Sequence, residues 1–161
     1  MDLDEKNYME VDFTKRIYAQ ISAIGGYVPE NIRTNSYLEK HTDTNDEWIV
    51  KRTGIKERRI LDDGLATSDM AVRAIENLIK DYNKDINQVD AIIVATSTPD
   101  MLMPATANII CEKLGIENIW AFDMNAACSG FLYALDMGAS LIESRRYKNV
   151  LVVGADKISA Y

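Results

Sequence analysis

The chain has 161 residues, of which 47% are hydrophobic and 27% charged, a composition typical of a soluble globular domain with one sizeable core. Its formal net charge of −7 argues against non-specific binding to nucleic acid or to an anionic membrane surface. No uninterrupted apolar run reaches the roughly 18 residues that a membrane-spanning helix needs. We therefore expect a cytoplasmic protein with neither nucleic acid nor a membrane as its partner.

The few metal-ligating side chains exclude a zinc centre of the usual kind. Two cysteines and one histidine are too few for a disulfide framework or for a Cys/His zinc site, so no metal is expected. His41 closes a polar helical stretch and is interpreted as a surface residue. A reducing compartment agrees with this cysteine usage.

The sequence predicts an N-terminal extension followed by one domain. Residues 1–15 are rich in Asp and Glu and predict a flexible acidic extension. From Arg16 onward, apolar and polar residues alternate, which predicts a strand over 16–23 that ends at Gly25-Gly26. Residues 16–161 show no linker or repeat, so we assign them to a single domain.

Helical and strand patterns alternate through the rest of the chain. Helices are predicted at 35–41, 46–52, 67–81, 104–114 and 128–145, and strands at 89–96, 119–127 and 150–155. This order predicts an α/β fold with a largely parallel or mixed sheet. The last strand is apolar throughout, as in strands covered on both faces, and nothing after it in the sequence could cover it. We interpret the end at Tyr161 as a cut within a longer protein.

Cys128 is the candidate nucleophile. It lies in Ala126-Ala127-Cys128-Ser129-Gly130-Phe131, where a predicted strand turns into a predicted helix through small residues. A thiol in the first turn of a helix faces the positive end of the helix dipole, which favours the thiolate. The alternative is a small buried core cysteine, and local physics alone leaves both open. Cys111 lies on the apolar stripe of its helix and is interpreted as core.

A basic cluster follows Trp48 in this otherwise acidic chain. Guanidinium groups suit phosphate oxygens and an exposed indole can stack on a purine, so the cluster suggests a grip on the adenine-phosphate end of coenzyme A. The alternative is a solvated charged surface beside a partly buried Trp48. The cations are Lys51, Arg52, Lys56, Arg58 and Arg59.

Three segments together resemble 3-oxoacyl-acyl-carrier-protein synthase III, the initiating condensing enzyme of bacterial type II fatty-acid synthesis and a thiolase-fold protein. They are G-G-Y-V-P at 25–29, D-T-N-D-E-W-I-V-K-R-T-G-I at 43–55, and A-F-D-M-N-A-A-C-S-G-F at 121–131. The resemblance implies two similar halves packed as α-β-α-β-α layers, of which this chain is the first. It also places a catalytic histidine and asparagine in the second half, so this chain alone is expected to be inactive.

The resemblance assigns roles position by position. Cys128 matches the acyl-accepting cysteine, while Trp48 and Arg52 match residues that stack on the adenine and contact the phosphates of coenzyme A. Thr44 is expected to meet the adenine as well. Met103 matches a bulky residue that crosses a homodimer interface to line the partner's acyl pocket.

The implied reaction joins an acyl-CoA primer, expected to be acetyl-CoA, to malonyl-acyl carrier protein with loss of carbon dioxide. Acyl-CoA is then a substrate, and no tightly bound cofactor is expected. Two alternatives stay open. One is a related thiolase-fold synthase, of secondary metabolism or of the hydroxymethylglutaryl-CoA type; the other is a non-catalytic fragment that binds acyl-CoA or carrier protein.

Overall fold

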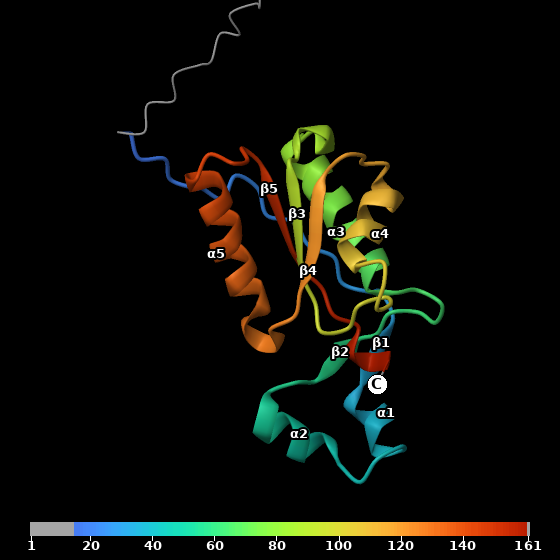
Figure 1. Ribbon diagram of the computed structural model, residues 1–161. Coiled ribbons are helices and arrows are strands. Elements are labelled where there is room, and N and C mark those ends of the chain that lie inside the picture. The colour runs from blue at the N-terminus through green and yellow to red at the C-terminus, as the bar shows by residue number, and fades with distance from the viewer. Residues whose placement is uncertain (1–14, 161) are drawn as a thin grey trace, which may run out of the picture.

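The computed structural model describes residues 15–160 and shows a three-layered α/β body with a smaller lobe beyond one end of its sheet (Figure 1). Residues 1–14, which carry the predicted acidic extension apart from Lys15, lie outside the described part. The expected α/β class is confirmed. Helix α5 covers one face of the central sheet, and α3 and α4 cover the other.

The central sheet has the strand order β4-β3-β5, and both pairings are parallel. The only antiparallel pairing among the described residues joins β1 to β2 in a separate two-stranded sheet. The elements of the body are α3 (Thr67–Tyr82), β3 (Ala91–Ala95), α4 (Thr106–Leu114), β4 (Trp120–Met124), α5 (Gly130–Glu143) and β5 (Val150–Gly154), with short 3-10 turns at Ile86–Gln88, Ala127–Ser129 and Ile158–Ala160.

Strand β3 is the centre of the core, because every one of its residues is buried. Successive side chains of a strand point to opposite faces, so β3 supplies both helical layers. Ile92 and Val94 pack in the cluster that includes residues of α3 and α4, whereas Ile93 and Ala95 pack with Ala134 of α5. This double burial explains why the strand is apolar without alternation.

The smaller lobe contains β1 (Ile32–Thr34), α1 (Asn35–Glu39), α2 (Asp46–Thr53) and β2 (Glu57–Arg59). Buried Asn35 ties these elements together: its Nδ2 donates to Asp46 Oδ1 at 2.7 Å and to the Ile55 carbonyl at 2.8 Å. Its Oδ1 accepts a hydrogen bond from the Arg58 guanidinium. One amide side chain thus fixes the start of α2 relative to β2.

The predicted strand at 16–23 is wrong, because these residues form no strand in the structure. A strand needs a neighbouring backbone to complete its hydrogen bonds, and here the alternating apolar side chains Ile17 and Ile21 are exposed. The chain instead approaches α3 at Gly25, where a Cβ would lie 2.5 Å from Leu78 Cβ. The absence of a side chain at residue 25 permits this close packing.

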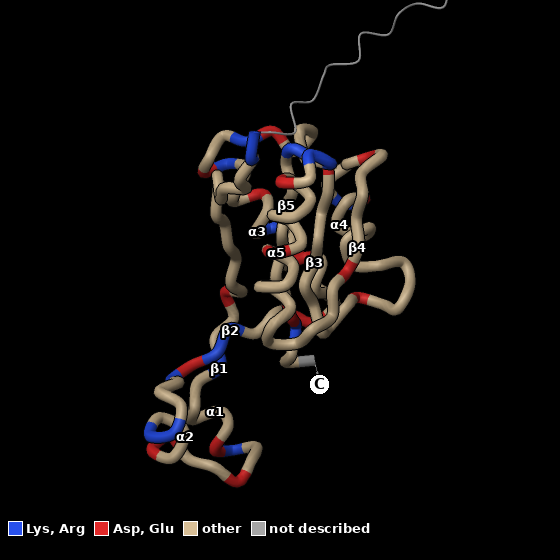
Figure 2. The backbone as a smooth tube through the Cα atoms, turned by 60° about the vertical axis from the view of Figure 1, so that its left-hand side comes forward, with Lys and Arg blue, Asp and Glu red and all other residues tan. Residues whose placement is uncertain are grey.

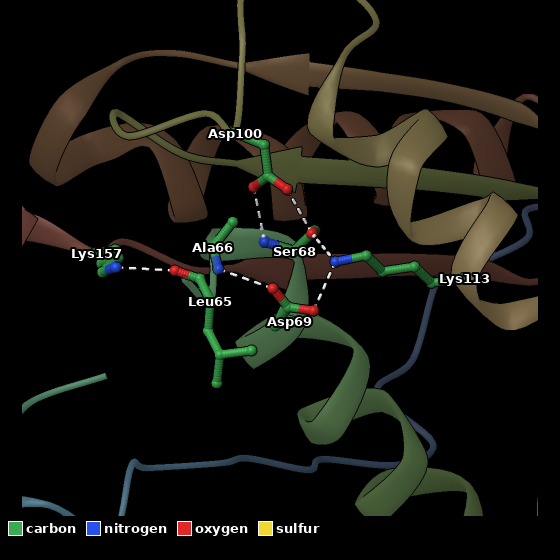
Figure 3. A network of polar contacts seen from close by, with 7 residues as sticks. All are labelled: Leu65, Ala66, Ser68, Asp69, Asp100, Lys113 and Lys157. Atoms are coloured by element: carbon green, nitrogen blue, oxygen red, sulfur yellow. Dashed lines mark hydrogen bonds and ion pairs between the residues drawn. The ribbon is translucent and has the colours of Figure 1, made fainter. Parts of the chain in front are cut away.

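A polar network joins the start of α3 to α4 and to the loop after β3 (Figure 3). Asp100 Oδ1 accepts from the Ser68 N–H at 2.9 Å, and its Oδ2 accepts from the Ser68 hydroxyl at 2.5 Å. Lys113 Nζ on α4 donates to Ser68 Oγ at 2.7 Å and to Asp69 Oδ1 at 2.6 Å. The network holds both helices and the 97–105 loop in one arrangement.

Candidate functional site

Cys128 lies in a sharp turn between β4 and α5, as the sequence predicted, and its side chain is exposed. Ala127, just before it, has φ of +44°, a left-handed conformation that costs a non-glycine residue roughly 1 kcal/mol or more. A hydrogen bond of 3.1 Å from the Ser129 N–H to the Ala126 carbonyl closes the turn. The thiol is therefore presented to solvent on a tight elbow, and the alternative of a buried core cysteine is wrong for Cys128.

One detail of this turn differs from expectation. Helix α5 begins at Gly130, so Cys128 lies in the 3-10 turn that leads into the helix and not in its first α-helical turn. The small residues of this segment favour a sharp turn before the regular helix starts. The thiol still lies at the amino-terminal end of α5, where backbone N–H groups lack intrahelical partners.

Between Met124 and Ile142 the sequence has one charged residue, Asp136, and a helix that is apolar nearly all round is predicted to be buried. For α5 this prediction is wrong among the described residues. Its buried stripe consists of Gly130, Ala134 and Gly138. The stripe packs closely on the sheet, since a Cβ on Gly138 would lie 3.2 Å from Val152 Cγ2. The opposite side is exposed and apolar, and it includes Phe131, Leu132, Tyr133 and Met137.

The carboxyl ends of the three parallel strands meet beside the Cys128 turn. The loop after β3 contacts the segment after β4, because the Thr96 N–H donates to the Met124 carbonyl at 3.1 Å and Ser97 Oγ donates to Asn125 Oδ1 at 3.4 Å. The same loop contacts the segment just after β5, where Asp156 Oδ1 accepts from the Ser97 N–H at 2.7 Å. Ligands of open parallel sheets bind at this kind of edge.

Trp48 and Arg52 lie one turn apart on α2, which is the helix that the sequence predicted at 46–52. Asn45 caps the helix, since its Oδ1 accepts from the Trp48 N–H at 2.8 Å. The guanidinium carbon of Arg52 lies 5.3 Å from the centre of the Trp48 ring, within the range of a cation–π contact. Because the indole is 53% exposed, much of its surface is open to a stacking ligand.

Thr44 lines a shallow hollow beside Trp48. The hollow has a volume of about 170 Å³ and is also lined by Asp43 and Asn45. Among the buried side-chain oxygens and nitrogens of residues 15–160, Thr44 Oγ1 is the one left without a hydrogen-bond partner. A buried hydroxyl without a partner is costly, so a polar ligand group in the hollow would relieve it.

The five cations of the basic cluster do not act alike. Arg58 donates to Asn35 inside the lobe, and Arg59 donates to the carbonyls of Pro29 and Glu30 at 3.4 and 3.3 Å. These two arginines therefore help to hold the lobe together. The remaining three cations, Lys51, Arg52 and Lys56, are exposed, and Figure 2 shows the Lys and Arg positions along α2 and β2.

Met103 lies in a strongly exposed apolar loop between β3 and α4. It is 84% exposed, and its neighbours Met101 and Leu102 are 50% and 99% exposed. Both ends of this loop are fixed, because the Asp100 carboxylate accepts from the Ser68 N–H and the Asp100 N–H donates to Thr106 Oγ1 at 3.2 Å. Three apolar side chains are thus held out from the body.

The segment that joins β4 to α5 and helix α2 lie toward the same end of the molecule, beyond the carboxyl end of the sheet (Figure 1). Cys111 and His41 are separate from both sites. Cys111 is buried in the core of the α3–α4 layer, as predicted, and burial raises the pKa of its thiol. His41 is exposed on the surface and stacks on Tyr37 with ring centres 4.0 Å apart.

Sequence reasoning missed the residues that support the Cys128 turn, namely Ser97, Asn125 and Asp156. Each follows the end of a parallel strand, and that position is the signal that could have found them.

Among the described residues, no group of three or more His, Cys, Asp and Glu side chains is arranged to hold a metal ion. Within the same part of the chain, no helix is both long and apolar enough to cross a bilayer.

Comparison with known proteins connects this geometry to one group of enzymes. Residues 122–161, which include Cys128, match the family model of 3-oxoacyl-[acyl-carrier-protein (ACP)] synthase III. Over 141 residues the chain is 55% identical to the beta-ketoacyl-[acyl-carrier-protein] synthase III 2 of Halalkalibacterium halodurans, a match that covers 88% of this chain and 42% of the relative. The chain is homologous to the N-terminal half of 3-oxoacyl-[acyl-carrier-protein] synthase III.

Solved structures show the same relationship in three dimensions. The synthase III of Thermus thermophilus superposes with a TM-score of 0.84 at 44% identity, over 88% of this chain and 44% of that protein. The priming beta-ketosynthase of the R1128 polyketide pathway gives a TM-score of 0.85 at 31% identity, over 90% of this chain and 43% of that one. The fold is therefore thiolase-like, and the chain spans less than half the length of the synthase III relatives it matches.

Proposed function

We propose that the protein carrying this chain is an acyltransferase that joins an acyl-CoA primer to malonyl-acyl carrier protein. The observation that supports this most directly is the exposed Cys128 on its elbow, inside the segment that matches the synthase III family model. An exposed thiol at the amino-terminal end of a helix has the surroundings expected of a nucleophilic cysteine. Acetyl-CoA is the proposed primer, and no tightly bound cofactor is required.

In the proposed reaction, the Cys128 thiolate attacks the acyl-CoA carbonyl, a new carbon–sulfur bond forms, and coenzyme A leaves as the thiol after taking up a proton. Malonyl-acyl carrier protein then loses carbon dioxide, and the resulting carbanion attacks the acyl-cysteine carbonyl. A carbon–carbon bond forms, the carbon–sulfur bond to Cys128 breaks, and 3-oxoacyl-carrier protein is released. The chain's own contribution is to hold the nucleophile and to bind the primer.

The primer-binding role falls to α2 and the hollow beside it. The half-exposed Trp48 ring offers a face for the adenine, and Arg52 beside it offers a charge for the phosphates. The unpartnered Thr44 Oγ1 supplies a hydrogen-bonding group at the edge of the same hollow. Aromatic, cationic and hydroxyl groups therefore converge where a nucleotide would need them.

The proposal extends to partners and location. The exposed loop with Met101, Leu102 and Met103 is a suitable contact for a second copy of the protein, because exposed apolar groups of this size are usually covered. A homodimer built through this loop would place Met103 at the partner's acyl site. The protein would work in the cytoplasm with malonyl-acyl carrier protein as its second substrate.

A second candidate function is supported by the structural match to the priming ketosynthase of a polyketide pathway. Such an enzyme would use the same acyl-cysteine but differ in primer or acceptor. Incubation with a set of acyl-CoA primers and malonyl-acyl carrier protein, followed by mass analysis of the products, separates the two functions. Acetyl-CoA as the favoured primer supports initiation of fatty-acid synthesis.

Covalent labelling tests the central claim. When the protein is mixed with acetyl-CoA in the absence of malonyl-acyl carrier protein, we expect one acetyl group per chain, on the peptide that contains residues 126–131. Cys111 serves as an internal control, because burial raises its pKa and keeps its thiol protonated. Acetyl label on Cys111, or full condensation activity in Cys128→Ser, would contradict the proposal.

A further inference from the structure

Asp156, just beyond β5, organises the loop that follows β3. Its Oδ1 accepts from the Ser97 N–H at 2.7 Å and from the hydroxyls of Thr96 and Thr98 at 3.3 and 3.2 Å. The N–H of Lys157 donates to Thr98 Oγ1 at 2.8 Å, which adds a second link between the same two segments. One carboxylate oxygen therefore holds three successive residues at the carboxyl edge of the sheet.

The loop held by Asp156 contacts the entry side of the Cys128 turn, and the last residue of β3, just before that loop, contacts its exit side. On the entry side, Ser97 Oγ donates to Asn125 Oδ1 at 3.4 Å, and the Thr96 N–H donates to the carbonyl at the end of β4. On the exit side, Gly130 packs against the last residue of β3, since a Cβ at residue 130 would lie 3.5 Å from Ala95 Cβ. The end of β3 thus lies between Asp156 and the segment that carries the thiol.

The Cys128 turn needs such support because its backbone is strained. Ala127 has φ of +44°, and a non-glycine residue keeps a left-handed conformation only when its surroundings maintain it. The charged carboxylate is also a stronger acceptor than a neutral group, so its bond to the Ser97 N–H resists the opening of the loop. Loosening the 96–98 loop would therefore release the turn from one of its two supports.

We propose that Asp156 is a positioning residue for Cys128, acting through the 96–98 loop to keep the nucleophile in its reactive orientation. Its effect on the structure of the turn follows from the hydrogen bonds above, and its effect on turnover rests on the proposed acyl transfer at Cys128. Asp156 does not itself touch the reacting atoms in this assignment. A positioning role predicts that loss of Asp156 slows the acylation step and leaves primer binding by α2 unchanged. A residue that only stabilises the fold would not separate these two effects.

The experiment compares Asp156→Ala, which removes the acceptor, with Asp156→Asn, which keeps an acceptor oxygen of the same reach. Exposed Asp136 on α5 provides the control variant Asp136→Ala. Hydrogen exchange is followed in residues 96–98 and 125–130, with α2 as the internal reference. Single-turnover acylation by acetyl-CoA gives the rate of the chemical step and the substrate concentration at half-saturation.

In Asp156→Ala we expect exchange at 125–130 to rise by about tenfold, while exchange in α2 stays unchanged. We expect the single-turnover acylation rate to fall by about tenfold or more, because small displacements of a reacting group have large effects on rate. The acetyl-CoA concentration at half-saturation should stay within about twofold of the wild-type value. Asp156→Asn should retain acylation within about threefold of the wild type, since hydrogen bonds from the loop are kept. Asp136→Ala should behave as the wild type in every measurement.

Three results would overturn the proposal: unchanged exchange at 125–130 in Asp156→Ala, wild-type acylation in that variant, or equal slowing in Asp156→Asn and Asp156→Ala. If Asp156→Ala does not fold, Asp156→Glu replaces it, because the extra methylene displaces the acceptor oxygen, and the same comparisons apply. A wild-type protein that takes no acyl group contradicts the proposed function instead. The exchange measurement still decides in that case whether Asp156 holds the Cys128 turn.

Discussion

Lys113 Nζ lies 2.6 Å from Asp69 Oδ1, and this ion pair joins α4 to the first turn of α3 (Figure 3). Asp69 also closes the start of its own helix, because its Oδ2 accepts from the Ala66 N–H at 2.7 Å. Burial alone would raise the pKa of Asp69. The hydrogen bonds from Lys113 and Ala66, together with the charges of Lys113 and Arg73, outweigh burial and hold that pKa below its usual 3.8.

The lowered pKa of Asp69 predicts the pH dependence of stability. A carboxylate with a folded pKa below its unfolded value stabilises the protein above the unfolded pKa, and the contribution is lost as pH falls through the folded pKa. Asp69→Asn should therefore lower the free energy of unfolding by about 0.5–1 kcal/mol at pH 7. The difference from the wild type should shrink as pH falls below 3.8, which urea titrations across this range would measure. Exposed Asp63→Asn is the control, and a pH-independent loss in Asp69→Asn would contradict the prediction.

Primer binding should depend on Trp48 and Arg52. This dependence should appear only for ligands that contain the adenine nucleotide of coenzyme A. Trp48→Ala and Arg52→Ala should each weaken acetyl-CoA binding by about 1–3 kcal/mol, the scale of a lost stacking or charge-assisted contact. An acetyl-pantetheine thioester, which lacks the adenine nucleotide, should bind both variants as it binds the wild type. Titration calorimetry measures both ligands. Exposed Lys84, which follows the end of α3, provides the control variant Lys84→Ala. Unchanged acetyl-CoA affinity in both Trp48→Ala and Arg52→Ala would remove these residues from the proposed site.

The orientation of α2 should depend on Asn35. This buried side chain donates to Asp46 at the start of α2 and to the Ile55 carbonyl after its end. Asn35→Ala leaves those acceptors and the Arg58 guanidinium without a partner, so we expect a loss of about 1–3 kcal/mol in the free energy of unfolding. Exposed Asn87→Ala should cost less, and urea unfolding compares the two variants. Equal and small losses in both would show that Asn35 is not a structural centre of the lobe.

The body of the fold could be predicted because its signals are local. The apolar run around Ile93 and the helical stripe that contains Cys111 specify a buried strand and a core-facing helix without reference to the rest of the chain. Strands β1 and β2 were missed, since three residues each are too short to show a period. The supposed strand at 16–23 failed for a different reason: alternation specifies which side chains share a face, but it does not supply a neighbouring strand.

The candidate site was predictable only in part. Cys128 stood out because a nucleophile on a strand-to-helix turn is recognisable from its small neighbours, and Trp48 and Arg52 stood out because of local charge. Asp156 did not stand out, because its contacts with the 96–98 loop join positions about sixty residues apart. Only the parallel pairing of β5 with β3 brings these segments together.

The first turn of α5 should depend on the absence of a side chain at residue 154. A Cβ on Gly154, the last residue of β5, would lie 2.9 Å from Cδ2 of Phe131, three residues after Cys128. Gly154→Ala must therefore displace the Phe131 ring or the helix that carries it. We expect a loss of about 1–2 kcal/mol in the free energy of unfolding, as for overpacked sites, together with slower acylation at Cys128.

A double-mutant cycle with Phe131→Ala identifies the cause. In that background the ring is gone, so Gly154→Ala should cost less than about 0.5 kcal/mol, and the two substitutions should show a clear interaction energy. Gly26→Ala is the matched glycine control, because a Cβ there meets nothing within 4 Å. Urea unfolding of the four variants of the cycle gives the energies, and acylation rates show whether the helix start has moved. An equal cost of Gly154→Ala with and without Phe131 would show that the ring does not limit the packing between β5 and α5.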